Sequence, residues 1–141
     1  MVDELRSADV PSLNDVVRSR TNLSEPDLEW LHALVADWQL LADLSFADLV
    51  LWVPDRDRSG FWAAAQMRPT TGPTAYFEDF VGTFSDHGTR PVDDSAYATG
   101  VIRRDADPEW WADDLPVRVE AIPVRRGGRT IAVVARSTNL V

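Results

Sequence analysis

Apolar residues recur at spacings of three and four along residues 28–42, a pattern typical of an amphipathic helix. The stripe consists of Leu28, Leu31, Val35, Trp38 and Ala42, and it is widened by Leu34 and Leu41. Ser24 stands where a helix cap belongs, and Pro26 is tolerated in a first turn. We therefore expect one helix of about five turns from about Asp27 to Asp43, preceded by a short helix that begins after Ser12.

The pattern then changes to that of strands. "FADLVLWVP" and "GFWAAAQMRP" are rich in β-branched and aromatic residues and each ends at a proline, which predicts two paired antiparallel strands. "TAYFEDFVGTF" predicts a third strand region. Near the C-terminus, "VRVEAIPV" and "TIAVVAR" flank Gly127 and Gly128, which predicts a hairpin.

Two details place these strands in a sheet. "IAVVA" is continuously apolar, so its strand should be central and covered on both faces. Pro123 has no amide hydrogen for a ladder, so its strand should be at an edge or bulged there. Residues 86–114 should be mostly loop with one short helix. We expect one α+β domain over 1–141 with an antiparallel main sheet, its helical part at about 12–43 and its sheet at about 44–137.

Composition limits the function classes. The chain has 141 residues, of which 45 % are hydrophobic and 26 % charged, and no apolar run approaches the roughly 20 residues that cross a bilayer. The first residues lack the pattern of a signal peptide, so we expect a cytoplasmic protein with no membrane partner. The net charge of −9 would repel a phosphate backbone, which argues against nucleic acid as a partner.

No catalytic or metal constellation is visible. The chain has no cysteine, and its two histidines, His32 and His87, lack the spacing that places two imidazoles on one helix face. "DRDRSG" matches part of a calcium loop, but Gln66 stands where that loop needs a glutamate, so a solvated turn explains it better. We expect no catalytic residue and no metal.

The stretch "AQMRPTTGPT" offers a candidate binding site. Gln66 and Arg68 are two apart and should project from one face of a strand, with hydroxyls following at Thr71 and Thr74. Such groups can bind an anion or the polar edge of a small ligand, and Trp52 or Trp62 would add apolar area. The alternative is that the same groups tie down a loop.

The long helix is a candidate dimer contact. Its stripe of Leu28, Leu31, Val35 and Trp38 is broad enough to pack on a sheet and to leave a seam for a second copy of the helix. The alternative is that the stripe packs only on its own sheet. The first interpretation predicts a homodimer.

Three stretches carry a family resemblance. "DWQLLADLSFADLVLWV", "AQMRPTTGPT" and "IPVRRGGRTIAVVAR" resemble, in that order, the N-terminal GAF-like sensory domain of actinobacterial two-component sensor histidine kinases of the PdtaS type. The likeness covers about residues 12–137. It implies a central antiparallel sheet of five or six strands, with the N-terminal helix and a C-terminal exit helix on one face and a ligand pocket on the other.

The resemblance also implies a function. Such a domain senses a small ligand or signal and relays it to a kinase; the alternative is a dimerisation and relay module without a ligand. In the family a PAS domain, a histidine-bearing domain and an ATPase domain follow, and the kinase phosphorylates a response regulator, often an RNA-binding antiterminator. None of their motifs is present here, so we expect a sensor fragment without enzyme activity, with "STNLV" beginning the connection to the next domain.

Overall fold

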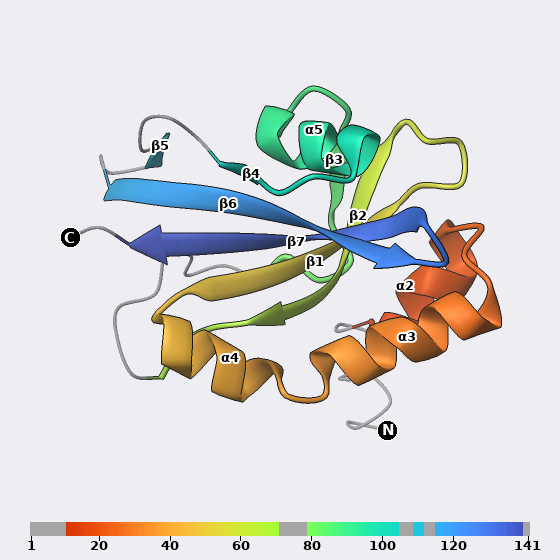
Figure 1. Cartoon of the computed structure of the whole chain (residues 1–141), viewed down its shortest axis with the longest axis horizontal. Helices are drawn as coiled ribbons and strands as arrows, with labels where there is room; N and C mark the ends of the chain where they lie inside the picture. The colour runs from red at the N-terminus through yellow and green to blue at the C-terminus, as the bar shows by residue number, and fades with distance from the viewer. Residues whose placement is uncertain (1–10, 71–78, 105–108, 112–114, 140–141) are drawn as a thin grey trace, which may run out of the picture.

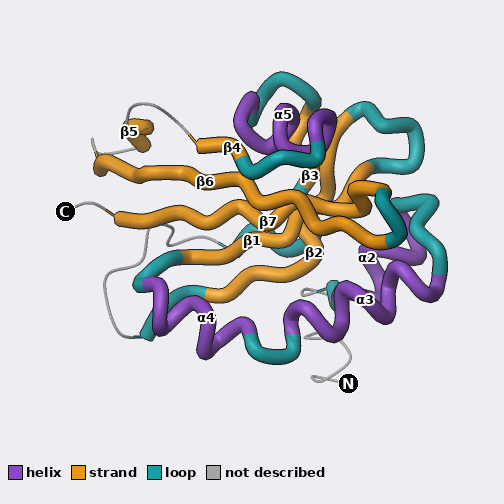
Figure 2. The backbone as a smooth tube through the Cα atoms, in the orientation of Figure 1, coloured by secondary structure: helices purple, strands orange, loops and turns teal. Residues whose placement is uncertain are grey.

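The computed structural model describes residues 11–70, 79–104, 109–111 and 115–139. Within these residues, an antiparallel sheet forms the centre of the domain, with three helices on one face and one on the other (Figures 1 and 2). The α+β class is confirmed. The resemblance implied helices on one face only, whereas the fourth helix covers part of the opposite face.

The first helices are α2 (Leu13–Arg20), α3 (Glu25–Val35) and α4 (Trp38–Ser45). Ser12 and Ser24 cap α2 and α3, each in a reciprocal capping box, as the sequence predicted. The single helix expected over 27–43 is wrong, because Asp37, with φ −110° and ψ 19°, leaves the helical conformation. A straight helix can follow a twisted sheet only over part of its length, and the break keeps both helices on the sheet.

The join between α4 and the first strand contains neither glycine nor proline. Phe46 closes the helix in the left-handed conformation, with φ 52°, a position that usually takes glycine. The Ala47 amide then donates to the Ala42 carbonyl at 3.2 Å, and the strand begins at the next residue. A left-handed phenylalanine therefore makes the tight turn that the sequence does not mark.

The sheet path has the order β3-β2-β1-β7-β6-β4, and the short β5 pairs with β6 beside it. All pairings are antiparallel. The six strands of the path agree with the expected five or six. The bounds are β1 (Asp48–Pro54), β2 (Gly60–Met67), β3 (Phe84–Asp86), β4 (Arg103–Arg104), β5 (Glu109–Trp111), β6 (Leu115–Arg126) and β7 (Arg129–Asn139).

The predicted β1–β2 pair and the β6–β7 hairpin are confirmed. The predicted third strand is displaced: its residues 74–78 lie outside the described residues, 79–83 are loop, and β3 starts only at Phe84. The short helix expected after residue 86 is α5 (Pro91–Thr99). Residues 137–139 of "STNLV" belong to β7, and the described residues contain no C-terminal exit helix.

The central strand and the proline behave as predicted. Residues 131–135 of β7 are all buried, between helices on one side and α5 on the other. Within the described strands, β4 pairs with β6 only up to Ala121, so Pro123 faces no strand on that edge. A bulge follows between Val124 and Arg125.

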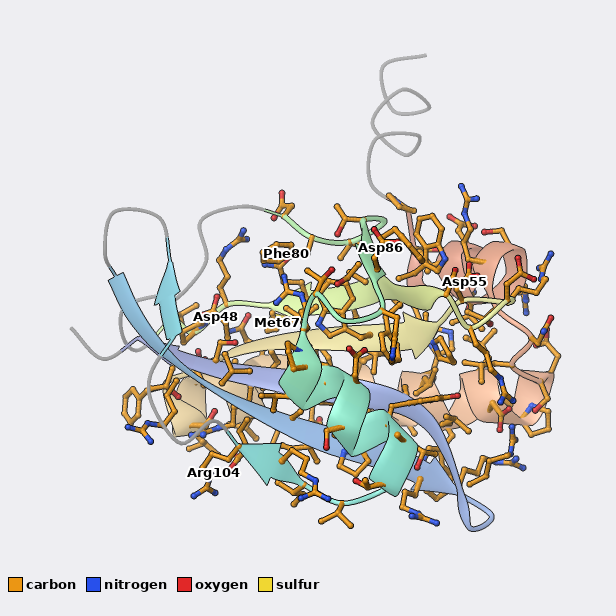
Figure 3. All side chains as sticks on the ribbon, turned by 90° about the horizontal axis from the view of Figure 1, so that it is seen from above. Asp48, Asp55, Met67, Phe80, Asp86 and Arg104 are labelled. Carbon is orange, nitrogen blue, oxygen red and sulfur yellow. The ribbon has the colours of Figure 1, made fainter. Side chains whose placement is uncertain are left out.

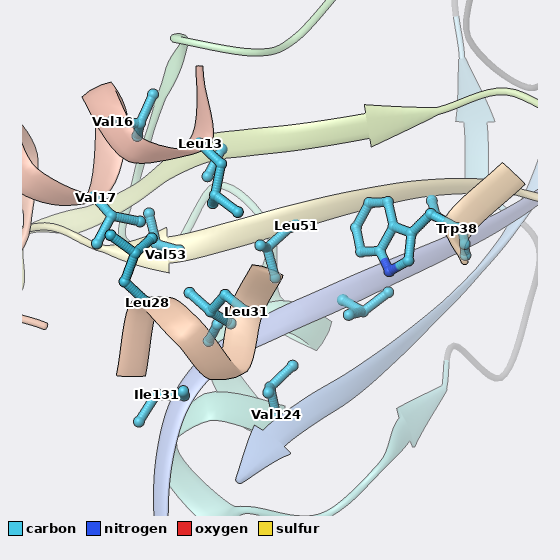
Figure 4. Packing of buried hydrophobic residues seen from close by; sticks show 14 of the residues in the cluster. Leu13, Val16, Val17, Leu28, Leu31, Trp38, Leu51, Val53, Val124 and Ile131 are labelled. Carbon is cyan, nitrogen blue, oxygen red and sulfur yellow. The ribbon is translucent and has the colours of Figure 1, made fainter. Parts of the chain in front are cut away.

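Two apolar layers hold the sheet. On the helix side, Leu31 and Trp38 pack against Leu51, Val53 and neighbouring residues of β7 (Figure 4). Two clusters lie on the opposite side. One consists of Val50, Trp52, Phe61, Ala63 and Ala135. In the other, Ala96 of α5 packs against Ala121 of β6 and Val133 of β7. No helix of the described part of the chain is long and apolar enough to span a membrane.

Candidate functional site

A hollow of about 360 Å³ opens on the α5 side of the sheet. Figure 3 looks onto this face, with α5 in front and Phe80 and Asp86 labelled. Strand β1, the loop before β3, β3 itself and the start of α5 provide its walls. The lining residues are Trp52, Asp79, Phe80, Thr83, Phe84, Ser85, Asp86, Thr89 and Arg90.

Arg90 and two aromatic rings form one side of the hollow. The guanidinium carbon of Arg90 lies 4.8 Å from the ring centre of Trp52 and 5.6 Å from that of Phe80, which are cation–π distances. The two rings are 6.4 Å apart. Trp52 is buried, and within the described residues its Nε1 has no hydrogen-bond partner. This side of the hollow can receive a flat group that accepts hydrogen bonds or carries negative charge.

The predicted ligand residues divide between the two faces. Trp52 is among the lining residues of the hollow. Trp62 lies on the helix side, where its Nε1 donates to Asp55 at 2.8 Å and Arg20 stacks on its ring at 4.5 Å. Because Trp52 and Trp62 face opposite sides of the sheet, they do not share a site. Thr71 and Thr74 lie outside the described residues.

Gln66 and Arg68 stand behind one wall of the hollow. The Gln66 Oε1 accepts the Phe80 amide hydrogen at 2.6 Å, and Arg68 Nη1 donates to Asp79 Oδ1 at 3.0 Å. Both side chains therefore hold the segment that carries Phe80 into the hollow. The structure brings them next to the site without placing them in its lining.

The same segment is tied to α4 from the other direction. Gln39 of α4 donates to the Arg68 carbonyl at 3.1 Å, and Asp43 accepts from the Thr70 amide at 2.7 Å and its hydroxyl at 2.9 Å. The Thr70 amide, more than any other group, lowers the pKa of Asp43, so the carboxylate is charged at neutral pH. A continuous set of contacts thus joins α4 to the wall of the hollow.

Phe80, Ser85 and Arg90 are site residues that the sequence reasoning missed. Arg90 immediately precedes Pro91, the first residue of α5, and that helix-start signal could have drawn attention to it. Phe80 and Ser85 lie in or near a segment that was predicted as strand. No local pattern in the sequence indicates that Phe80 and Ser85 line the same hollow as Trp52, which lies about 30 residues earlier in the chain.

The predicted dimer stripe is used inside the chain. Leu28, Leu31 and Trp38 are buried against the sheet, and Val35 is half-buried in the same cluster. Leu28, Leu31 and Trp38 are therefore not exposed for a contact with a second copy, and Val35 is exposed only in part. The exposed large apolar residues of these helices and of the turn after α4 are Trp30, Leu40, Leu41, Leu44 and Phe46.

The family model described as "Histidine kinase PdtaS, GAF domain" matches residues 13–141. The chain belongs to this family. The resemblance seen in the sequence is therefore confirmed, and the domain is the GAF sensor domain of the PdtaS type.

Curated relatives and a solved structure agree. The sensor histidine kinase PdtaS of Mycolicibacterium smegmatis is 37 % identical over 131 residues, which are 92 % of this chain and 26 % of the relative. PdtaS of Mycobacterium tuberculosis is 38 % identical over 127 residues, 89 % of this chain and 25 % of the relative. A solved sensor region of a sensor histidine kinase has a TM-score of 0.76 at 34 % identity and covers 94 % of this chain and 44 % of its own. The PdtaS GAF domain thus spans about a quarter of these relatives' length.

Proposed function

We propose that this GAF domain regulates a two-component sensor histidine kinase by binding a small ligand in the hollow beside Trp52 and Arg90. The observation that carries the proposal is the connection between that hollow and α4. Gln66 and Arg68 hold the wall of the hollow through Phe80 and Asp79, while α4 binds the backbone just beyond them.

The lining defines the ligand. An indole with an unpaired donor and a stacked guanidinium suit a flat or apolar ligand that has one acceptor or anionic group. Asp79 and Asp86 at the edge of the hollow oppose a highly charged anion. Arg90 lines the hollow and Arg68 does not, so we assign Arg90 to binding the ligand and Arg68 to positioning the wall through Asp79.

The signal would travel as a shift of packed elements. A ligand that moves Phe80 and Asp79 changes the positions of Gln66 and Arg68, and the contacts of Gln39 and Asp43 pass that change to α4. Helix shifts of an ångström or two are a common form of such coupling. The helix also carries exposed leucines through which a neighbouring domain or subunit can respond.

The direct test is a thermal-shift screen of nucleotides and small metabolites against three forms of the domain. They are the wild type, Arg90→Gln and the control Arg103→Gln, which changes an exposed arginine on β4 and alters net charge equally. We expect a compound that raises the melting temperature of the wild type and of Arg103→Gln but not of Arg90→Gln. A shift that Arg90→Gln retains would contradict the assignment of the hollow.

A second function is supported by the same contacts. Arg68 is already paired with Asp79, and Arg90 is already stacked between Trp52 and Phe80, so the domain's own side chains fill part of the space. This favours a dimerisation and relay module without a ligand. A screen in which no compound shifts the wild type, combined with a homodimer in sedimentation, would support this second function over the first.

The remaining parts of the function concern the whole protein. We place the domain ahead of PAS and kinase domains in a cytoplasmic homodimer whose kinase phosphorylates a response regulator. The support is the match to sensor histidine kinases of which this chain corresponds to about a quarter. Transfer of labelled phosphate from ATP by the longer protein, and none by residues 1–141 alone, is the expected result.

A further inference from the structure

Arginines gather at one end of the sheet, away from the hollow beside Trp52. The β1–β2 turn, the β6–β7 turn and the α2–α3 connection meet there (Figure 1). The arginines at this end are Arg18, Arg20, Arg56, Arg58, Arg125, Arg126 and Arg129. Arg18 pairs with Glu25, and Arg126 and Arg129 pair with Asp27, but Arg56 and Arg58 form no ion pair within the described residues. In a chain of net charge −9 this end is locally positive.

A hollow of about 100 Å³ lies among these side chains. Arg56, Arg58 and Arg129 line it, with Tyr97 and Thr130 beside them. In contacts with described residues, Arg56 and Arg129 use only Nη2, toward backbone carbonyls of α2 and toward Asp27, so Nε and Nη1 of each remain to donate to a ligand.

One carboxylate also lines this hollow. Asp55 accepts hydrogen bonds from the Trp62 indole, the Asp57 amide and the Ser59 hydroxyl. The Trp62 indole contributes most to holding the pKa of Asp55 below its ordinary value. These three donors engage the negative charge of Asp55, and the three guanidinium groups that line the hollow outnumber this one carboxylate.

A second hollow, of about 170 Å³, adjoins the first. The two share Pro54, Arg58 and Tyr97. Phe61 and Tyr97 meet edge to face in the second hollow, with ring centres 5.3 Å apart, and Ala98 adds apolar surface. His87 and Asp94 stand at its rim, 3.4 Å apart. A polar hollow lined by arginines therefore continues into an apolar one.

Arg58 connects the two hollows and has an unusual backbone. Its φ is 59°, in the left-handed region that favours glycine. A residue other than glycine, asparagine or aspartate is uncommon in that backbone conformation, and such residues are often found at functional sites. Here the arginine side chain lines both hollows.

We infer that the two hollows form one binding site for a small organic anion, distinct from the hollow beside Trp52. The carboxylate or phosphate of the ligand lies between Arg56, Arg58 and Arg129, where forked donors suit its oxygens. Its apolar body lies against Phe61 and Tyr97. This site is additional to the proposed function and does not depend on it.

The test is a titration followed by ¹H–¹⁵N NMR, with phenyl phosphate as the probe. Inorganic phosphate supplies the charge without the ring, and phenol supplies the ring without the charge. We expect phenyl phosphate to shift the amide signals of residues 56–60 and 97–100 saturably below about 10 mM, and each of the other two compounds to bind at least several-fold more weakly. Changes confined to the residues around Phe80 and Arg90 would overturn the inference, as would no saturable change.

The variant Arg58→Gly separates binding from folding. Glycine adopts a positive φ readily, so this substitution should leave the fold intact while removing the shared guanidinium. We expect phenyl phosphate to bind about tenfold more weakly or worse, the loss typical of a charge-assisted hydrogen bond. The control Arg118→Gln, an exposed position on β6, should bind within about twofold of the wild type. Equal affinity in Arg58→Gly and the wild type would refute the site.

Discussion

Asp27 and Arg129 are joined by a two-point ion pair, in which Arg129 Nη2 lies 3.1 Å from Oδ1 and 3.0 Å from Oδ2 of the carboxylate. Arg126 Nη1 donates to the same Oδ1 at 3.1 Å. The Asp27 side chain is 1 % exposed and also accepts the Ser24 amide in the capping box of α3. One buried carboxylate therefore fixes the start of α3 to the β6–β7 hairpin.

We predict that Asp27→Asn lowers the free energy of unfolding by about 2 kcal/mol. The substitution removes the charge that two guanidinium groups face, and it weakens the helix cap. The value is below that of a fully buried pair because both arginines remain partly in contact with water. Urea unfolding measures it. The control Glu29→Gln, at an exposed position on the same helix, should change stability by less than about 0.5 kcal/mol.

The stabilisation by Asp27 should depend on pH. Burial by itself would raise the pKa of Asp27, but the hydrogen bonds from Ser24 and Arg129 outweigh it and hold the pKa below the ordinary value. A depressed pKa in the folded state means that the contribution is complete above the unfolded pKa of about 3.9 and is lost as pH falls through the folded pKa.

Urea unfolding at several pH values checks this direction. The difference in stability between the wild type and Asp27→Asn should be constant from about pH 5 to 7 and should shrink below about pH 4. Asp55 and Asp43 also have lowered pKa values, through bonds chiefly from Trp62 and Thr70, so the wild type should lose stability in the same acid range. A difference that grows on acidification would show that the sign is wrong.

Gly60 is predicted to be essential for the pairing of β2 with β3. A Cβ added there would lie 2.2 Å from the Ser85 carbonyl oxygen and 3.0 Å from the Asp86 Cα, both of the backbone. Gly60→Ala should therefore cost about 2–3 kcal/mol and displace the strand that lines the hollow beside Trp52. At Gly88 an added Cβ meets nothing within 4 Å, although φ is +93°. Gly88→Ala should thus cost only the conformational strain, about 1 kcal/mol.

Local signals in the sequence predicted the helix starts and failed at the break between α3 and α4. Ser12 and Ser24 satisfy backbone amides within three residues, so their effect can be read from the sequence alone. Ala36 and Asp37 contain no comparable signal, because the twist of the distant sheet, rather than local preference, decides where the helix turns. Phe46 illustrates the same limit, since this exposed residue adopts a left-handed conformation that glycine usually takes, and nothing in its residue type indicates it.

The candidate site was predictable only in part for the same reason. Alternation along β1 and β2 could not separate the faces of Trp52 and Trp62, because the faces depend on how the two strands pair: Trp52 lies opposite Ala63, and Trp62 lies opposite Val53. The alternative for "AQMRPTTGPT" is that its polar groups tie down a loop. The contacts of Gln66 with Phe80 and of Arg68 with Asp79 agree with this alternative. Arg90 comes from a later segment of the chain, and it stacks on Trp52 only because the folded domain brings the two residues together.

Under the proposed function, Asp43→Ala should uncouple ligand binding from kinase control in a protein that also carries the kinase domains. Asp43 accepts both hydrogen bonds from Thr70, so its loss removes two of the contacts that join α4 to the segment behind the hollow. We expect the domain to retain its ligand affinity, because Asp43 is not among the lining residues. Autophosphorylation should no longer respond to the ligand. The matched control is Asp37→Ala, an exposed aspartate at the start of the same helix, which should leave the response intact.

The homodimer proposal leads to a prediction about the exposed face of α4. Leu40 and Leu44 are four residues apart on one side of the helix and are 58 % and 69 % exposed, whereas Trp38 and Ala42 face the sheet. A second copy of the domain that covered this side would remove apolar surface from water, and glutamate in its place would oppose association without disturbing the core.

Sedimentation velocity at tens of micromolar, about the range for a weak isolated contact, should therefore show a dimer for the wild type and a monomer for Leu40→Glu/Leu44→Glu. Val101→Glu is the matched control, because Val101 is also apolar and 53 % exposed but lies after α5, away from α4. It should remain dimeric. A monomeric wild type would remove the support for self-association through this domain. A dimer that survives the double substitution but is disrupted by Val101→Glu would move the contact to the segment between α5 and β4.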